Sequence, residues 1–218
     1  MTDERLPEHF VVLSKVAPEL MIDLKYTTHD NLIGRPLAGY SKEGVAVITE
    51  IAANSLRAMA QKLQQASIKN QLKMSAPTLI IWDTYRPDRA CEDFWHWSQS
   101  ECQKTKNEYY PNIDKRDFFK LGYIARKSSH SRGSTADLNI IDTATGKMLD
   151  MGTRFDFMDP LSHPDNLDVS KEVYANRQFL KKLLSDFGWL GIEQEWWHFT
   201  YTDEPYPQTY FNFDVKKY

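Results

Sequence analysis

The sequence predicts an α+β fold, because strand-like and helix-like segments are intermixed without the regular alternation of a doubly wound sheet. One supporting observation is the apolar run Thr78–Trp82, whose β-branched residues are typical of a buried strand. A second is the helical spacing of apolar residues over 45–66 and again over 168–187. Prolines and glycines are spread along the chain without a repeat or a low-complexity linker, which indicates one domain spanning residues 1–218.

The first part of the chain is expected to hold two short strands followed by a long helix. Residues 10–13 and 20–26 have the composition of short strands, and a turn-rich loop follows at 30–39. Over 45–66, isoleucine, leucine and methionine recur near the helical period and alanine is abundant. This pattern predicts the first strong helix.

The middle of the chain is expected to hold a strand, a helix and an irregular stretch. The strand at 78–82 ends at Asp83, and Pro87-Asp88 suits the first turn of a helix that continues to about residue 104. Residues 109–114 show no regular period.

Three further elements are expected in the C-terminal half. Residues 128–141 form a polar turn that runs into a strand, and 168–187 form the last long helix. Gly188 is placed to end that helix. The aromatic segment 196–201 has the composition of a strand.

Charge and the start of the chain exclude several classes of protein. The chain carries 27 basic and 30 acidic residues, so no excess of cations is present to neutralise phosphates. This argues against a general binder of nucleic acid or of membrane surfaces. The polar start Met1–Phe10 is unlike a signal peptide, and no stretch approaches the roughly 18 to 20 apolar residues of a transmembrane helix. We therefore expect a cytoplasmic protein.

The two cysteines are not expected to form a disulfide or a zinc site. Cys91 and Cys102 lie in one expected helix, about 16 Å apart along its axis, which is too far for a disulfide. Without a C-x-x-C element, a structural zinc site built on cysteine is also excluded. Any metal in this protein must therefore be held by nitrogen and oxygen.

Four residues of metal-binding or acid-base type stand out in two short segments. His130 and Asp137 lie in the polar turn and the strand after it, and Glu195 precedes His198 by three positions. Two imidazoles and one carboxylate are a ligand set of catalytic zinc, which leaves a fourth position for water. Alternation along the strand turns Asp137 away from the apolar layer of its neighbours. Arg86, at the end of a buried strand, could stabilise an oxyanion.

Glu195 is the candidate for the acid-base carboxylate, because the aromatic residues around it would reduce local polarity and raise its pKa. Each of these residues, considered alone, also fits a structural role that involves no catalysis or metal binding. His130 or Asp137 could cap a turn, Arg86 could be a solvated loop cation, and Glu195 could pair with a surface lysine. The H-x6-D spacing alone does not decide between these readings.

The two motifs together resemble the D-alanyl-D-alanine dipeptidases of the VanX type, which are zinc peptidases. Their signature, S-x-H-x(6)-D followed by E-x-x-H, is matched by Ser128–Asp137 and Glu195–His198. Other segments resemble the family in the same order over roughly residues 20–215. They are Asp23–Tyr26, Asp30-Asn31 with Gly34, Trp82–Pro87, Tyr109–Asp114, Met151–Asp159 and Asp203–Pro207.

The resemblance implies one zinc ion per chain, bound by His130, Asp137 and His198. It implies hydrolysis of D-Ala-D-Ala to two D-alanines by a zinc-activated water, with Glu195 as general base and acid. Arg86 would stabilise the tetrahedral intermediate. These roles come from the family and are expectations for this chain.

The resemblance also implies how a dipeptide is recognised. An aspartate corresponding to Asp156 holds the free amino group of the substrate, and Ser129 and Tyr26 match pocket-lining positions. The implied fold is a central, mainly antiparallel sheet with flanking helices, shared with zinc D-Ala-D-Ala carboxypeptidases, lysostaphin-like peptidases and the hedgehog signalling domain. The expected partner is a small dipeptide and not nucleic acid or a membrane; a homodimer is left open.

Two alternative functions follow from the same fold. One is a related zinc carboxypeptidase or endopeptidase that acts on cell-wall peptides, which Asp156 and the cytoplasmic type of N-terminus disfavour. The other is a zinc-containing binding module without catalysis. Glu195 and Arg86 argue against that module, because a purely structural site needs neither.

Overall fold

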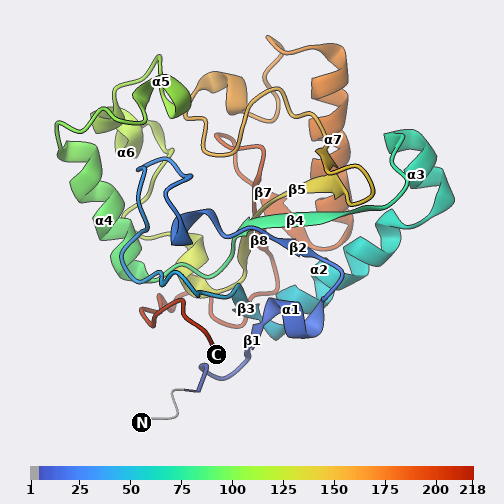
Figure 1. Cartoon of the computed structure of the whole chain (residues 1–218), viewed down its shortest axis with the longest axis horizontal. Helices are drawn as coiled ribbons and strands as arrows, with labels where there is room; N and C mark the ends of the chain where they lie inside the picture. The colour runs from blue at the N-terminus through green and yellow to red at the C-terminus, as the bar shows by residue number, and fades with distance from the viewer. Residues whose placement is uncertain (1–4) are drawn as a thin grey trace.

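A six-stranded sheet forms the centre of the computed structural model, which describes residues 5–218 (Figure 1). Its main path runs in the order β2-β4-β5-β8-β7, and β6 pairs with the end of β5. Only the pair β2 and β4 is parallel. The strands are β2 (Met21–Ile22), β4 (Pro77–Asp83), β5 (Thr135–Asp142), β6 (Lys147–Met148), β7 (Trp189–Gly191) and β8 (His198–Tyr201).

A separate two-stranded sheet and seven helices complete the described chain. The small sheet pairs β1 (Phe10–Val12) with β3 (Val47–Thr49) in antiparallel register. In Figure 1, α4 to α6 lie on one side of the central strands, and α2, α3 and α7 lie on the other. The helices are α1 (Leu13–Val16), α2 (Glu50–Leu63), α3 (Ala66–Leu72), α4 (Asp88–Gln99), α5 (Lys106–Tyr109), α6 (Phe118–Leu121) and α7 (Lys171–Asp186). Short 3-10 turns lie at Lys25–Thr27, Lys115–Asp117, Ser129–Arg132 and Pro160–Ser162.

This architecture confirms the predicted α+β class and the mainly antiparallel central sheet. The strand predicted at 78–82 is β4, whose seven residues are all buried. The turn and strand predicted at 128–141 are the 3-10 turn Ser129–Arg132 and β5. Within residues 5–218, no helix is long and apolar enough to span a membrane.

The helix predicted over 45–66 starts too early. Val47–Thr49 form β3 and pair with β1, because β-branched side chains fit a strand better than the first turn of a helix. Helix α2 begins only at Glu50 and ends at Leu63.

Two other elements were predicted to be longer than they are. The strand expected at 20–26 is limited to Met21–Ile22, and Lys25–Thr27 form a 3-10 turn that the Thr27 hydroxyl closes by donating to the Leu24 carbonyl. Helix α4 ends at Gln99 instead of residue 104. Its last turn is capped from outside, since Lys115 Nζ donates to the carbonyl oxygen of Trp97 at 2.7 Å.

Because α4 ends at Gln99, the two cysteines do not lie in one helix. Cys102 lies beyond α4, so its distance from Cys91 does not follow from helix geometry. Both thiols are nevertheless free, with Cys91 buried and Cys102 exposed.

Helix α7 ends at the glycine that its sequence predicts, and its N-terminal cap is a serine that was not predicted. The Ser170 hydroxyl accepts a hydrogen bond from the Val173 N–H, and the helix therefore begins three residues later than the predicted residue 168. Gly188 follows the helix with a φ of +84°, a left-handed conformation that favours glycine.

Candidate active site

Three neighbouring strands place three polar side chains next to one another across the central sheet. Asp83 of β4 is the register partner of Asp137 of β5, and Asp137 is the partner of His198 of β8. An irregularity in β4 between Ile81 and Asp83 shifts the register just before Asp83. The sheet pairing, and not a loop, therefore fixes the distance between Asp137 and His198.

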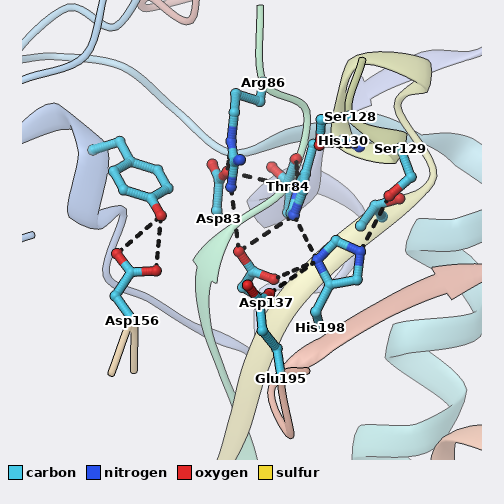
Figure 2. A network of polar contacts seen from close by, with 12 residues as sticks. Asp83, Thr84, Arg86, Ser128, Ser129, His130, Asp137, Asp156, Glu195 and His198 are labelled. Atoms are coloured by element: carbon cyan, nitrogen blue, oxygen red, sulfur yellow. Dashed lines mark hydrogen bonds and ion pairs between the residues drawn. The ribbon is translucent and has the colours of Figure 1, made fainter. Parts of the chain in front are cut away.

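His130 joins this row from the 3-10 turn before β5. Its Nε2 lies 3.3 Å from Asp137 Oδ2 and 3.2 Å from His198 Nδ1. His198 Nδ1 lies 3.2 Å from Asp137 Oδ1 (Figure 2). Among residues 5–218, this is the one cluster of at least three histidine, cysteine or acidic side chains with ligand atoms close enough to share a metal ion.

The hydrogen bonds around this cluster leave lone pairs facing its centre. His130 Nδ1 donates to the Thr84 carbonyl, 2.6 Å away, and in the neutral ring this places the lone pair on Nε2, which faces Asp137. On the other ring, His198 Nε2 lies 3.1 Å from the Ser129 hydroxyl. Asp137 Oδ1 is buried and receives no well-aligned hydrogen bond.

These donor atoms fit a tetrahedral zinc ion. Zinc bonds of about 2.0–2.2 Å place neighbouring ligand atoms roughly 3.3–3.5 Å apart. The two ring nitrogens lie 3.2 Å apart, and each lies 3.2 or 3.3 Å from a different carboxylate oxygen of Asp137. The hydrogen bond from His130 to a backbone carbonyl is the partner that metal-binding histidines usually have.

Electrostatics keep the cluster in the protonation state that a cation needs. Burial raises the pKa of Asp137, but the nearby His130 and His198 lower it more, so its net shift is downward. Burial lowers the pKa of His198, which favours the neutral imidazole. A carboxylate beside a neutral histidine can bind a metal without first losing protons.

A second buried carboxylate holds Arg86 beside the cluster. Arg86 Nε donates to Asp83 Oδ2 at 2.9 Å, and Nη2 lies 3.5 Å from Asp137 Oδ2. Asp83 also accepts a hydrogen bond of 2.7 Å from the Tyr40 hydroxyl. Burial alone would lower the pKa of Arg86, but Asp83 and the other acidic neighbours raise it, so the guanidinium stays charged.

Glu195 lies immediately before β8, with its Oε2 3.8 Å from His198 Nδ1. Its side chain is buried. Burial raises its pKa well above the usual range, and the negative charges of Asp137 and Asp156 raise it further. The sequence-based expectation that its aromatic surroundings raise this pKa therefore has the right direction.

Asp156 lies opposite the cluster, with its own separate hydrogen bonds (Figure 2). The Tyr26 hydroxyl is 3.0 and 2.9 Å from its two carboxylate oxygens. Burial raises the pKa of Asp156 to about 7, with a contribution from the charge of Asp137. Its backbone has a φ of +62°, an unusual conformation for a residue other than glycine.

One cavity of about 240 Å³ connects these groups. That volume is below the range of most drug-sized ligand pockets and suits a very small molecule. Of the eight site residues predicted from sequence, all but His130 line it, and His130 lies buried directly behind Asp137 and His198. The predicted residues that line it are Tyr26, Arg86, Ser129, Asp137, Asp156, Glu195 and His198.

Sequence reasoning did not single out Asp83 or Tyr123 as site residues. A carboxylate that ends a fully buried strand, three residues before an arginine, is the signal that could have indicated Asp83. Tyr123 lines the cavity and its hydroxyl lies 3.1 Å from His163 Nε2. Nothing in the sequence near Tyr123 indicates that contact.

Comparison with known proteins decides the family. The Peptidase_M15 model, described as D-ala-D-ala dipeptidase, matches residues 7–216. The chain belongs to this peptidase family. The motif resemblance is thereby confirmed, and the chain is an enzyme of the peptidase class.

Individual relatives agree with this family. The D-alanyl-D-alanine dipeptidase of Enterococcus faecium is 39% identical over 95% of this chain and 98% of the relative. The D-alanyl-D-alanine dipeptidase of Streptomyces coelicolor is 37% identical over 94% of this chain and 98% of the relative. A solved zinc complex of the D,D-pentapeptidase VanY, an E175A mutant, aligns with a TM-score of 0.41 and 14% identity, over 72% of this chain and 74% of that one. That similarity is too low to support an inference.

Proposed function

We propose that this peptidase hydrolyses D-Ala-D-Ala to two D-alanines and uses one zinc ion held by His130, Asp137 and His198. The observation that carries the proposal is the placement of two different cation-binding groups on one cavity of about 240 Å³. The metal-type cluster lies at one end and the lone carboxylate of Asp156 at the other. The names of the relatives, all D-alanyl-D-alanine dipeptidases, support the same substrate.

Zinc in this cluster would supply a Lewis acid that polarises the scissile carbonyl and lowers the pKa of the attacking water toward neutrality. His130, Asp137 and His198 would hold the ion with three protein ligands, the number found in catalytic zinc sites. Ser129 supports the ligand set by contacting His198 Nε2 and thereby fixing the ring.

Glu195 takes the proton from the attacking water and delivers it to the nitrogen of the leaving D-alanine. Its carboxylate lies 3.8 Å from His198 Nδ1, at the metal-cluster end of the cavity. Burial raises its pKa, and a cation in the cluster lowers that pKa again. An intermediate pKa is what a group that both accepts and donates a proton requires.

Arg86 stabilises the negative charge that forms on the carbonyl oxygen. Asp83 fixes the guanidinium through Nε and keeps it charged, while Arg86 itself lines the cavity. A charged donor that is already in place needs no reorganisation when the oxyanion appears.

Asp156 binds the amino group of the substrate. Its carboxylate is buried on the cavity and accepts hydrogen bonds from Tyr26 and from the backbone N–H of Leu32. The charge of Arg86 acts on Asp156, but Arg86 forms its ion pairs with Asp83 and Asp137, so an ammonium group is a suitable partner for Asp156. A fixed distance between this carboxylate and the metal selects peptides with the free amine one residue from the scissile bond.

The experiment that tests this function combines metal analysis with three substrates. We expect one zinc per chain and rapid hydrolysis of D-Ala-D-Ala. We expect far slower hydrolysis of L-Ala-L-Ala and of N-acetyl-D-Ala-D-Ala. A zinc-loaded protein that releases no alanine from D-Ala-D-Ala would overturn the proposal.

The proposal also includes the location, domain organisation and assembly of the protein. We expect a cytoplasmic location, a single domain over residues 1–218, and a protein that acts on a small peptide as a monomer or homodimer. The single family match over residues 7–216 supports the one-domain prediction. Cell-wall carboxypeptidase or endopeptidase activity is disfavoured by the small cavity and by the position of Asp156 in it.

A further inference from the structure

Helix α7 carries an arginine on its buried face. Arg177 is only 1% exposed and lies in line with Val173, Leu180 and Leu184, which are also buried. The spacing of these four residues is that of one helix stripe, in which a charged side chain is unexpected. A guanidinium in this position requires an explanation, because burying a charge without a counter-charge is costly.

All the hydrogen-bond acceptors of Arg177 are neutral backbone carbonyls. Nε and Nη2 donate to the Met151 oxygen at 2.9 and 2.6 Å. Nη2 also donates to the Leu161 oxygen at 2.7 Å, and Nη1 donates to the His163 oxygen at 2.8 Å. Burial lowers the pKa of Arg177 to about 10, so it remains charged at neutral pH. The planar group therefore joins three points of the backbone at once.

These three carbonyls bracket one segment of the chain, residues 151–163. Asp156 lies in its middle, in the left-handed backbone conformation described above. The segment has little regular structure of its own beyond the 3-10 turn Pro160–Ser162. At its start, Gly152 packs so closely on α7 that an added Cβ would lie 2.8 Å from Val173 Cγ1. Contacts with α7 thus help to fix both the start and the end of this segment.

The same segment also contacts the chain next to the catalytic base. The N–H of Trp196, the residue after Glu195, donates to the Ser162 carbonyl at 3.1 Å. The indole N–H of Trp196 donates to the Thr153 hydroxyl at 2.9 Å. Thr153 and Ser162 are themselves joined by a hydrogen bond of 2.9 Å between their hydroxyls. The segment that carries Asp156 is therefore hydrogen-bonded directly to the chain that carries Glu195.

We propose that Arg177 is a positioning residue that fixes Asp156 relative to Glu195 and the metal cluster, and so sets the selection for a free amino group. This inference rests on the proposed function, since Asp156 is taken as the amine-binding residue. Arg177 does not line the cavity and acts only through the backbone of residues 151–163.

The test compares Arg177→Lys and Arg177→Met with the matched control Gln178→Ala. Lysine keeps the positive charge but cannot reproduce the planar fork, and methionine removes the charge. Gln178 is the next residue on α7 and donates to the Pro164 carbonyl, one residue beyond the clamped segment. Steady-state kinetics on D-Ala-D-Ala and N-acetyl-D-Ala-D-Ala, zinc content, melting temperature and amide exchange of residues 151–163 are measured for each variant.

We expect Arg177→Lys to keep its zinc and to raise KM for D-Ala-D-Ala about tenfold, with a smaller effect on kcat. The preference for the free amine over the acetylated substrate should fall by a similar factor, and amide exchange should accelerate in residues 151–163. Gln178→Ala should resemble the wild type in all these measurements.

Two results would overturn the proposal. One is an Arg177→Lys protein with a lower melting temperature but unchanged KM, amine preference and amide exchange. The other is loss of folding in both Arg177 variants, because the residue would then serve the fold itself. Failure of the wild type to hydrolyse D-Ala-D-Ala would instead reject the proposed function, and amide exchange would still report whether Arg177 fixes the segment.

Discussion

The two ends of the cavity are built in different ways. At the metal end, Asp137 and His198 are register partners on paired strands, and His130 follows from the turn before β5. At the amine end, Asp156 lies on an irregular segment that depends on contacts with α7 and Trp196. The sheet therefore fixes the residues proposed to bind the metal, whereas loop contacts fix the carboxylate proposed to select the substrate. Changes at the first end should abolish activity, and changes at the second should alter selectivity.

The two ends have an electrostatic feature in common. Each presents a buried carboxylate to the cavity: Asp137 lies among histidines, with Arg86 Nη2 3.5 Å from its Oδ2, and Asp156 lies beside a tyrosine hydroxyl. The pKa of Asp137 is lowered by its neighbours, while that of Asp156 is raised to about 7 by burial. The metal end is thus ready for a permanent cation, and the amine end for a cation that arrives with the substrate.

The largest expected effect is at the metal end, in the variant His198→Ala. Removal of one of three ligands should lower zinc content to a small fraction of the wild-type value and reduce hydrolysis of D-Ala-D-Ala by at least about a thousandfold. Metal analysis by atomic absorption, alongside turnover, checks this. His96→Ala, which changes an exposed histidine on α4, is the control and should keep both properties. A His198→Ala enzyme that retains metal and activity would remove His198 from the ligand set.

Glu195→Gln separates chemistry from metal binding at the same end. The amide is similar in size but cannot exchange protons, so kcat should fall about 10²- to 10⁴-fold while zinc content stays near that of the wild type. Glu193→Gln provides a matched control two residues away on an exposed side chain. If kcat is unchanged in Glu195→Gln, another group must carry the proton.

The sequence predicted the metal end better than the amine end for a physical reason. His130, Asp137, Glu195 and His198 fall in two short motifs, and the alternation of one strand already separates Asp137 from the apolar face. The clamp on Asp156 by Arg177 involves backbone carbonyls, and carbonyls are present in every residue type. The sequence shows an arginine in the apolar stripe of α7, but it cannot show which carbonyls that arginine contacts.

The same distinction explains the errors in the fold. Strand β4 was predictable because its continuous apolar run is a local property. The strand at Val47–Thr49 was predicted as helix, because only its pairing with β1, far back in the sequence, makes it a strand. Likewise, α4 ends where Lys115 reaches its last turn, a contact over 18 residues.

Asp156→Asn tests the amine end. Asparagine keeps the shape and tolerates the left-handed backbone, so folding should be preserved. It lacks the charge that binds an ammonium group, and we expect kcat/KM for D-Ala-D-Ala to fall about 10- to 100-fold with zinc retained. The ratio of free-amine to N-acetylated substrate should fall in parallel. Asp150→Asn, on an exposed carboxylate nearby, should change neither quantity. Unchanged discrimination against the acetylated substrate in Asp156→Asn would show that another group binds the amine.

The same variant makes a prediction for the stability of the metal-free protein. Because the folded-state pKa of Asp156 is raised from 3.8 to about 7, the folded protein holds a proton that the unfolded chain loses as pH rises from about 4 to 7. The contribution of Asp156 to the free energy of unfolding is therefore greatest at low pH and is lost as the pH rises through about 7. Its upper limit is roughly 4 kcal/mol. Thermal melts of chelator-treated protein should show a weaker decline between pH 5 and 8 in Asp156→Asn than in the wild type. Equal declines would mean that Asp156 is already ionised in the folded protein.

Tyr26→Phe is expected to have the smallest effect, and its pH dependence is the informative part. Burial raises the pKa of Tyr26 well above its usual value, so the hydroxyl stays protonated and donates to the carboxylate of Asp156. Its removal should raise the pKa of Asp156 further, because a hydrogen bond to the charged form is lost. An ionised Asp156 is needed to hold the ammonium group, so kcat/KM should fall only severalfold at pH 8 and more strongly near pH 6.

Zinc content should not change, and Tyr174→Phe on α7 serves as the control. A loss of the same size at every pH would show that Tyr26 shapes the cavity without tuning Asp156. In that case only the metal end of the cavity would depend on tuned protonation.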